Sequence, residues 1–142
     1  MTKTVVLDTG PLGQLTKPKA NPEIVMWLSV ARMQGYRIIV PEIVDFELRR
    51  NLIAERLSNS IALLDALIDD LDYLPIDTPT MRLAAEYWAR SKQQGRMAAD
   101  PKELNGDVIL AAQAHQVDGV VATDNIGHLS LFVEASHWRD IH

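Results

Sequence analysis

The sequence contains no cysteine, so disulfide bonds, thiolate metal sites and a cysteine nucleophile are excluded. It also lacks any apolar run that approaches the roughly 20 residues that a membrane-spanning helix needs. Its first residues lead directly into a strand-like run and have no signal-peptide architecture. We therefore expect a soluble, cytoplasmic protein that is not attached to a membrane.

An excess of basic residues is also absent, because 14 Lys and Arg stand against 19 Asp and Glu, for a formal net charge of −5. Affinity for nucleic-acid phosphates comes largely from basic side chains, so this composition argues against a protein that coats nucleic acid nonspecifically. It leaves room for an enzyme that acts on nucleic acid through a metal ion and a local basic patch.

Several catalytic sequence motifs are missing as well: there is no G-x-G-x-x-G, Walker loop, H-E-x-x-H or G-x-S-x-G sequence. The four histidines have no spacing that is typical of a zinc site, and we expect them to be surface or structural residues. His128 is a candidate to lie near the site, since it follows the candidate site residue Asp124 by four residues.

The 142 residues are the usual size of one domain, and no linker or repeat divides them, so we expect a single domain over residues 1–142. Strand-like apolar runs alternate with stretches of helical periodicity. The expected strands cover residues 4–7, 37–40, 73–76 and 119–123, and the expected helices cover residues 22–34, 42–53, 54 or 58 to 71, 78–94 and 105–116, with an irregular loop at 96–104. Strands separated by helices need crossover connections, which predicts an α/β fold: a three-layer α/β/α sandwich around a mainly parallel sheet.

Two acidic residues end apolar runs that are predicted to be strands. Asp8 follows Thr4-Val5-Val6-Leu7, and Asp124 follows Gly119-Val120-Val121-Ala122-Thr123. In parallel α/β sheets, ligand sites form beyond the carboxyl ends of the strands, so both acids are candidates for one site. The structural alternatives are a helix cap for Asp8 and a turn residue for Asp124, beside which Asn125 could supply a carbonyl oxygen ligand instead.

Glu47 lies on the apolar side of its predicted helix. It shares that side with Ile43 and Val44, where an acid is expected to have a partner. An ion pair with Arg50 across one helical turn is the alternative explanation. Asp45, in contrast, has charged neighbours at helical spacing and is expected to face solvent.

Asp107 follows Asn105-Gly106, which we interpret as the start of a helix with Asn105 as its cap. An acid in the first turn gains from the helix dipole, and this is the structural alternative for Asp107. However, Asp107 shares a helix face with Leu104, Leu110 and Ala111. The pattern therefore predicts that its side chain points toward the sheet.

The four acids would be costly in half-buried positions unless a positive partner met them. If the fold gathers Asp8, Glu47, Asp107 and Asp124, the natural partner is a divalent metal ion. Oxygen-only ligands select the hard cations Mg²⁺ or Mn²⁺ rather than zinc. Such a site is suited to phosphoryl chemistry.

Four short motifs carry these acids in a characteristic order: Leu7-Asp8-Thr9, Glu47-Leu48-Arg49-Arg50, Gly106-Asp107-Val108-Ile109-Leu110-Ala111-Ala112 and Val121-Ala122-Thr123-Asp124-Asn125. Together they resemble the PIN-domain ribonucleases, and most of all the VapC-type toxins of bacterial toxin–antitoxin pairs. The resemblance covers essentially the whole chain. It implies a three-layer α/β/α fold whose acids bind Mg²⁺ or Mn²⁺ and hydrolyse RNA, together with a homodimer and a cognate antitoxin.

Asp8, Glu47 and Asp107 match the three firmest positions of the family. The fourth site residue is open, because the family pattern of Thr, any residue, then Asp or Asn falls on Asn125 rather than Asp124. Many members also have an Asp-Phe pair where this chain has His128-Leu129. This departure motivates the main rival function, a PIN-fold RNA- or protein-binding module with little catalytic power. A phosphohydrolase of small esters lacks support, since no second acid follows Asp8 by two residues.

Two further sets of residues are candidates for contacts with partners. The basic set is a candidate phosphate-facing patch, with plain solvated charges as the alternative: Arg49, Arg50, Lys92 and Arg96. The apolar set could line a groove for an antitoxin or simply pack in the core: Ile61, Leu64, Leu67, Ile68 and Leu71.

Overall fold

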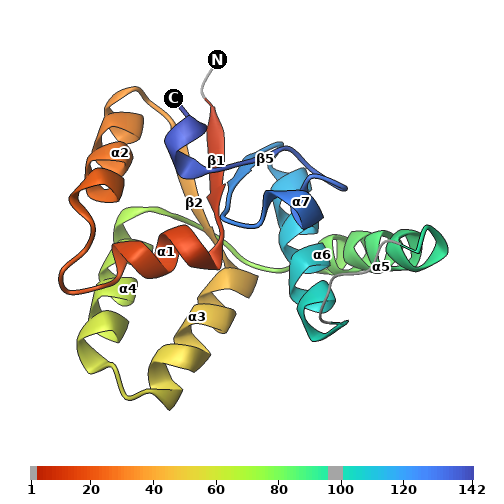
Figure 1. Ribbon diagram of the computed structural model, residues 1–142, viewed down its shortest axis with the longest axis horizontal. Coiled ribbons are helices and arrows are strands. Elements are labelled where there is room, and N and C mark those ends of the chain that lie inside the picture. The colour runs from red at the N-terminus through yellow and green to blue at the C-terminus, as the bar shows by residue number, and fades with distance from the viewer. Residues whose placement is uncertain (1–2, 96–100) are drawn as a thin grey trace.

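A five-stranded parallel sheet forms the centre of the structure (Figure 1). The structure is a computed structural model that describes residues 3–95 and 101–142, with the side chains of helix α6 described from residue 104 onward. The strand order is β3-β2-β1-β4-β5, and every neighbouring pair is parallel. The strands are β1 (Thr4–Leu7), β2 (Arg37–Pro41), β3 (Asp72–Leu74), β4 (Val120–Ala122) and β5 (Ala135–Ser136).

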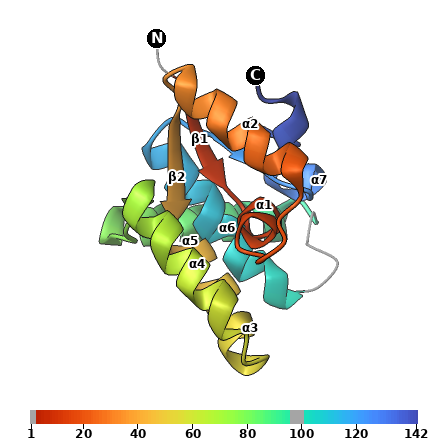
Figure 2. The ribbon, with the colours of Figure 1, turned by 90° about the vertical axis from the view of Figure 1, so that its left-hand side faces the viewer.

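Helices cover both faces of this sheet. They are α1 (Thr9–Leu15), α2 (Pro22–Met33), α3 (Glu42–Ala54), α4 (Ser58–Asp70), α5 (Thr78–Gln93), α6 (Pro101–Gln116) and α7 (Ile126–Leu129), followed by a 3-10 helix, η1 (Trp138–Asp140). Helices α1, α2 and α4 lie on one side of the sheet and α5 and α6 lie on the other (Figures 1 and 2). The predicted three-layer α/β/α architecture is confirmed. None of the described helices is long and apolar enough to cross a membrane.

Strand β1 is the centre of the hydrophobic core. Val5, Val6 and Leu7 are all fully buried, as expected for the middle strand of a parallel sheet that is covered on both faces. Ile39 of β2 and Val121 of β4 are buried beside them. A continuous apolar run, rather than an alternating one, therefore marks the strand that leads to Asp8.

The helix signals in the sequence are confirmed for α2. The Asn21 side chain accepts a hydrogen bond from the Glu23 backbone N–H at 2.9 Å, and Pro22 occupies the first helical position. Gly35, just past the helix, has φ +83°, a conformation that favours glycine. Local capping chemistry is enough to define this element.

The apolar stripe of α4 packs in the core. Leu64 is fully buried and Leu71, which follows the helix, is 9% exposed, while the other members of the stripe are partly buried against the same core. Of the two explanations that the sequence allowed, core packing accounts for these side chains.

Helix α6 starts earlier than the sequence predicts. It begins at Pro101, so Asn105 lies inside the helix and the predicted loop is wrong for residues 101–104; residues 96–100 lie outside the described part. The Asn-Gly pair was misleading because a side-chain carbon on Gly106 would collide with the Glu47 carboxylate, so this glycine serves packing. Asp107 lies beyond the first turn, which weakens the helix dipole as an explanation for it.

Helix α1 was not expected, because Thr9-Gly10-Pro11 has the composition of a turn. In the structure, Pro11 occupies the first turn of α1, where its missing N–H has no helical partner to lose. Asp8 is the N-cap and accepts a hydrogen bond from the Thr9 N–H at 2.7 Å. The capping alternative for Asp8 is therefore present in the structure, and the site must be judged on its other contacts.

Gln113 is a buried polar residue that joins the elements around the site. Its side-chain oxygen accepts from the Ile43 N–H at 3.2 Å, in the first turn of α3, and its amide nitrogen donates to the Leu74 carbonyl at 2.8 Å. The side chain has no exposed surface. One residue of α6 thus fixes the start of the helix that carries Glu47.

Gln113→Leu is expected to lower the free energy of unfolding by ~1–3 kcal/mol, because it leaves buried backbone groups without their partners. Urea unfolding followed by circular dichroism measures the change. Gln116→Leu is the matched control at the exposed end of α6, and it should stay within about 0.5 kcal/mol of the native chain. A Gln113→Leu protein as stable as this control would show that the cross-link contributes nothing.

Candidate functional site

The parallel register brings the ends of three strands together. Leu7 of β1 pairs with Ala122 of β4, and Ala122 pairs with Ser136 of β5. The residues that follow these three, Asp8, Thr123 and His137, therefore stand side by side at one edge of the sheet. The sequence predicted that Asp8 lies close to the end of β4, but it gave no sign that His137 lies there too.

Asp8 is half-buried between two hydrogen-bond donors. One carboxylate oxygen accepts from the Thr9 N–H, and the other accepts from the Thr123 hydroxyl at 2.7 Å. The Thr123 hydroxyl also accepts from the Asn125 N–H at 2.8 Å. Thr123 therefore links the first strand to the turn that carries Asp124 and Asn125.

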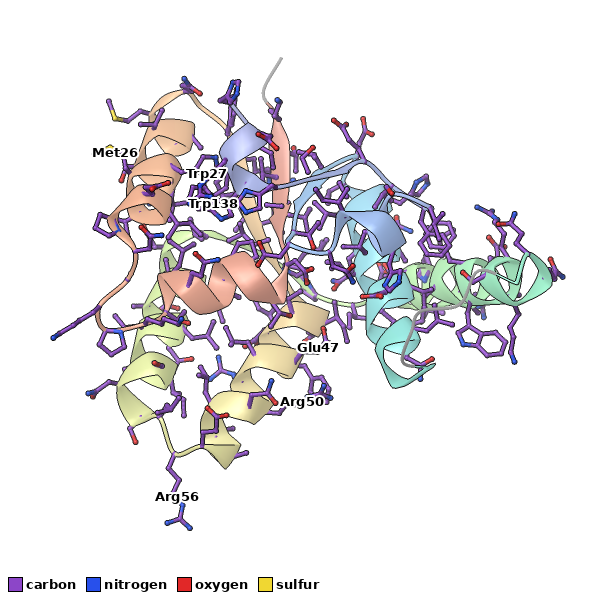
Figure 3. The ribbon with its side chains drawn as sticks, in the orientation of Figure 1. Met26, Trp27, Glu47, Arg50, Arg56 and Trp138 are labelled. Atoms are coloured by element: carbon purple, nitrogen blue, oxygen red, sulfur yellow. The ribbon has the colours of Figure 1, made fainter. Side chains whose placement is uncertain are left out.

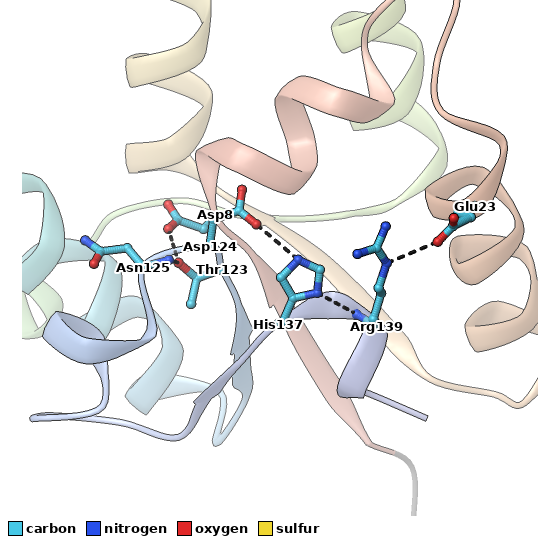
Figure 4. Close-up of polar contacts among 7 residues, drawn as sticks. All are labelled: Asp8, Glu23, Thr123, Asp124, Asn125, His137 and Arg139. Carbon is cyan, nitrogen blue, oxygen red and sulfur yellow. Dashed lines mark hydrogen bonds and ion pairs between the residues drawn. The ribbon is translucent and has the colours of Figure 1, made fainter.

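Asp124 lies next to Asp8 (Figure 4). Its carboxylate approaches the backbone of Gly10 so closely that a side-chain carbon at Gly10 would collide with it. Its Oδ1 is also 3.4 Å from His137 Nε2. Half of the Asp124 side chain is exposed, at 52%, so this acid borders solvent at the rim of the site.

Glu47 projects from α3 on the side that faces α6 (Figure 3). Its carboxylate lies against the backbone of Gly106, the residue before Asp107. Ile43, Val44 and Leu48 around it in α3 are buried, which confirms that Glu47 shares the inward side of the helix. Arg50, the alternative partner, places its guanidinium over the Phe46 ring at 5.1 Å.

Asp107 faces inward as its helical spacing predicts, with 18% of its side chain exposed. Its Oδ2 lies 3.7 Å from Nδ1 of His128, and the same imidazole nitrogen is 3.2 Å from the Asn125 amide nitrogen. A path of contacts therefore leads from Asp107 through His128 and Asn125 to Thr123 and Asp8. Asp124 lies beside Asp8 on this path, and Glu47 adjoins it through the backbone of Gly106, next to Asp107.

The electrostatics of this edge favour a positive ligand. Burial raises the pKa of the Asp8 carboxyl above its ordinary value, and the charge of Asp124 raises it further, while hydrogen bonds from Thr123 and Thr9 lower it by a smaller amount. The ionised form of Asp8 is thus penalised in the folded protein. A cation held between these carboxylates would offset the penalty.

The donor set fits a hard divalent cation, because it consists of carboxylate oxygens from separate elements. In their present positions, however, no three acids or histidines of the described residues are close enough together to form a ready-made metal site. Asp8 lies with Asp124, and Glu47 lies against the backbone of Gly106, the residue before Asp107.

Only some residues of the candidate basic patch are placed so that they could contact a phosphate group. Arg49 is held by Asp45 at 3.0 Å and by Asp65 at 2.8 Å, so it joins α3 to α4. Lys92 lies over the Trp88 ring at 5.6 Å on α5. Arg96 lies outside the described residues. Arg50 lies on the exposed side of α3, three residues after Glu47. Its guanidinium stacks on Phe46 and forms no ion pair with any of the described residues.

The sequence expectation for Asp45 is wrong, and that for His137 is incomplete. Asp45 is not on a solvent face: its side chain is 16% exposed and accepts hydrogen bonds from Arg49 and, at 2.9 Å, from the Tyr73 hydroxyl, because β3 packs over it. His137 is a structural residue, as expected, because it caps η1, but its position against Asp124 was not predicted. A strand of two residues, β5, gives no periodicity from which its register could have been predicted.

Thr123→Val keeps the shape of this buried side chain and removes its hydroxyl, so we expect the free energy of unfolding to fall by ~1–3 kcal/mol. The pKa of Asp8 should rise further, because the lost hydrogen bond favoured the ionised carboxylate. Urea unfolding and a carboxyl-carbon NMR titration measure these two effects. Thr123→Ser retains the hydroxyl and should resemble the native chain in both; a valine variant that does the same would contradict the assignment.

The five-stranded sheet and its acidic carboxyl edge define a PIN domain. A family model described as PIN domain matches residues 5–129, and the chain belongs to this family. No curated protein matches the chain. The family relationship predicted from the sequence motifs is confirmed.

Solved structures of VapBC and FitAB proteins have a similar fold. VapBC2 from Rickettsia felis, bound to a DNA fragment from its promoter, has a TM-score of 0.80 and 17% identity and covers 95% of this chain and 98% of its own. FitAcB from Neisseria gonorrhoeae has a TM-score of 0.67 and 26% identity, with 96% and 99% covered. VapBC-5 from Mycobacterium tuberculosis, a member of the VapBC family of toxin–antitoxin systems, has a TM-score of 0.61 and 19% identity, with 94% and 96% covered.

Proposed function

We propose that this protein is a metal-dependent endoribonuclease and the toxin of a toxin–antitoxin pair. The observation that carries the proposal is the acidic edge: Asp8, Glu47, Asp107 and Asp124 come from separate elements and lie along one connected set of contacts. Membership of the PIN-domain family and full-length likeness to VapBC complexes support the same activity. The family is commonly metal-dependent and its VapC members are typically ribonucleases.

Asp8 and Asp107 are the proposed ligands of the principal Mg²⁺ or Mn²⁺ ion, with Glu47 holding the ion or a water bound to it. For the fourth position we propose Asp124, because its carboxylate lies beside Asp8, whereas the side chain of Asn125 is turned to His128. Asn125 contributes instead through its backbone, whose N–H donates to Thr123. These contacts support Asp124 over Asn125 in the proposal.

When bound, the metal ion lowers the pKa of a coordinated water and stabilises the charge that develops on the phosphate. The half-exposed Asp124 carboxylate would accept a hydrogen bond from the attacking water and so orient it. Thr123 would keep Asp8 ionised and directed into the site by donating its hydroxyl proton. Direct attack of water on the phosphorus of an RNA phosphodiester, with the 3′-oxygen as leaving group, would leave a 5′-phosphate on the downstream fragment and a 3′-hydroxyl on the upstream fragment.

A protein partner is the second part of the proposal, as a homodimer and as a complex with an antitoxin. Exposed apolar side chains support it, since large hydrophobic groups that gather in one patch are typical of surfaces that bind proteins. A groove of about 470 Å³ between α5 and α6 is lined by such residues, among them Met81, Trp88 and Ile109. On the other side of the sheet, Met26 and Met33 of α2 are exposed at 64% and 86%.

A catalytically weak PIN-fold binding module is the second candidate. The observation in its favour is that no three acids or histidines of the described residues are close enough together to hold a metal ion. A metal-binding measurement therefore separates the two functions before any RNA is tested.

The test combines Mn²⁺ calorimetry with cleavage of structured RNA in Mg²⁺ or Mn²⁺. Glu47→Gln and Asp107→Asn are expected to lose both activities, while Asp69→Asn, an exposed acid of α4, keeps them. Native protein that binds no Mn²⁺ and cuts no RNA would exclude the nuclease and favour the binding module. Equal cleavage by native protein and both site variants would exclude the proposed site.

A further inference from the structure

His137 stands at the carboxyl end of the short edge strand β5, one strand beyond Asp124. The register pairs Ser136 with Ala122, so His137 and the turn after β4 leave the sheet next to each other. Figure 4 shows its imidazole between the Asp124 carboxylate and the backbone of Arg139. Both ring nitrogens therefore have a neighbour within contact distance, and these neighbours differ in chemistry.

The contact to Arg139 fixes the tautomer of this ring. His137 Nδ1 accepts a hydrogen bond from the Arg139 N–H at 3.2 Å, as the N-cap of η1. A nitrogen that accepts cannot carry the proton, so the neutral imidazole must be protonated on Nε2. That nitrogen lies 3.4 Å from Asp124 Oδ1, so the protonated side of the ring is next to the carboxylate.

The ring is also held in place by the C-terminal segment. Its neighbour Trp138 is buried, at 3% exposed, with ring centroids 5.2 Å apart. The Arg139 guanidinium lies 5.0 Å over the Trp138 ring, and its Nε donates to Glu23 of α2 at 3.1 Å. Trp27 of α2 donates to the Ile141 carbonyl at 2.8 Å, which anchors the end of the chain. The imidazole is therefore a preorganised donor on a fixed support.

Asp124 has three features that make such a donor useful. It is half exposed, it lies beside the like charge of Asp8, and the absence of a side chain on Gly10 leaves it space to approach. Repulsion from Asp8 and access to water both favour a side chain turned away from the site. An N–H on the outer side opposes that movement.

We propose that His137 is a positioning residue, whose fixed Nε2–H holds the Asp124 carboxylate beside Asp8. The role rests on the proposed function, in which Asp124 orients the attacking water. His137 itself touches neither substrate nor metal in this role. It acts through Asp124, in the way that outer-shell hydrogen bonds orient ligands at metal sites.

Two substitutions separate positioning from helix capping. In His137→Gln the amide nitrogen can reach the place of Nε2, so the donor to Asp124 is kept and the cap is lost. In His137→Asn the amide oxygen can take the place of Nδ1, so the cap is kept and the donor is lost. His115→Gln, at an exposed histidine of α6, is the control for the substitution itself.

We expect His137→Asn to keep its melting temperature, to bind Mn²⁺ about 10- to 100-fold more weakly, and to lose kcat while KM for RNA changes little. His137→Gln should retain most of the native affinity and kcat. In an Asp124→Asn background, His137→Asn should cause no further loss, since a residue that acts only through Asp124 shows full coupling to it. Equal behaviour of native, Asn and Gln variants would overturn the proposal, as would equal loss in both variants together with a lower melting temperature.

An NMR measurement separates this proposal from the proposed function. Long-range ¹H–¹⁵N spectra of the metal-free protein should show His137 protonated on Nε2, with a resonance that shifts in Asp124→Asn. If the native protein neither binds Mn²⁺ nor cuts RNA, the proposed function fails, and these spectra still decide whether His137 holds Asp124. Protonation of His137 on Nδ1, or an unchanged resonance in Asp124→Asn, would show that it does not.

Discussion

Asp8→Asn is expected to reduce RNA cleavage by at least about 100-fold, since even outer-shell changes at metal sites cost 10- to 100-fold. The same substitution should leave the metal-free protein at least as stable as the native chain at neutral pH. Activity and stability change in opposite directions because burial of the ionised Asp8 carboxylate is unfavourable for folding but useful for binding a cation. Few substitutions elsewhere in the chain should combine these two results.

The direction of the pH dependence follows from the raised pKa of Asp8. The folded state holds this proton more tightly than the unfolded state, whose carboxyl titrates near the ordinary value of 3.8. Protonated Asp8 therefore adds stability below pH 3.8, and the contribution is lost as the pH rises through the raised pKa. The stability of Asp8→Asn relative to the native chain should increase over that pH interval and then stay constant.

Asp77→Asn is the matched control, because Asp77 also caps a helix but has a lowered pKa. Ionised Asp77 adds stability above pH 3.8, which is lost as the pH falls through its lowered value, so this variant should show the opposite pH trend and normal cleavage. Urea unfolding across the acid range measures both trends. Mn²⁺ should raise the melting temperature of the native chain and of Asp77→Asn, but not of Asp8→Asn.

A stable, fully active Asp8→Asn protein would remove Asp8 from the site. A variant that loses both activity and stability at neutral pH would show that the carboxylate is mainly structural, as the cap of α1. The assay therefore decides between the two roles that the sequence allowed for this residue.

Alanine at Gly10 and at Gly106 is expected to reduce cleavage sharply without unfolding the protein. A side-chain carbon at Gly10 would displace the Asp124 carboxylate, and one at Gly106 would displace that of Glu47. Movement of a catalytic group by about 1 Å can cost on the order of 100-fold in rate. In both cases the obstructed atoms are the ends of flexible side chains, so the acids move and the backbone stays.

Gly13→Ala is the control that the structure offers. Gly13 is also helical, but its added carbon would meet Leu48 at 3.7 Å, an ordinary van der Waals contact. This variant should keep full activity and gain up to ~1 kcal/mol of stability, because alanine favours a helix over glycine. Cleavage rates and urea midpoints for the three variants, measured together, give the comparison. Equal rates in all three would show that neither glycine shapes the acidic edge.

The sequence predicted the elements whose signals are local. Continuous burial of Val5, Val6 and Leu7 follows from one uninterrupted apolar run, and α2 follows from a cap, a proline and a terminal glycine. The inward direction of Asp107 follows from helical spacing against Leu104 and Leu110. In each case the residues that determine the structure are neighbours along the chain.

Predictions failed where a distant residue supplied the reason. Asn105-Gly106 looked like a helix start, but Gly106 is explained by Glu47, far away on α3. Asp45 looked like a solvent-facing acid, but Tyr73 of β3 covers it. No periodicity within either segment carries this information.

The sequence by itself determined the alternation of strands and helices, and hence a parallel α/β sheet with acids at its carboxyl edge. Only the tertiary structure decided which side chains stand together there: that Asp124 lies beside Asp8, that Asn125 turns to His128, and that His137 meets Asp124. The physical reason is that propensity and periodicity act over a few residues. The register between strands, which places these three contacts, depends on packing across the whole sheet.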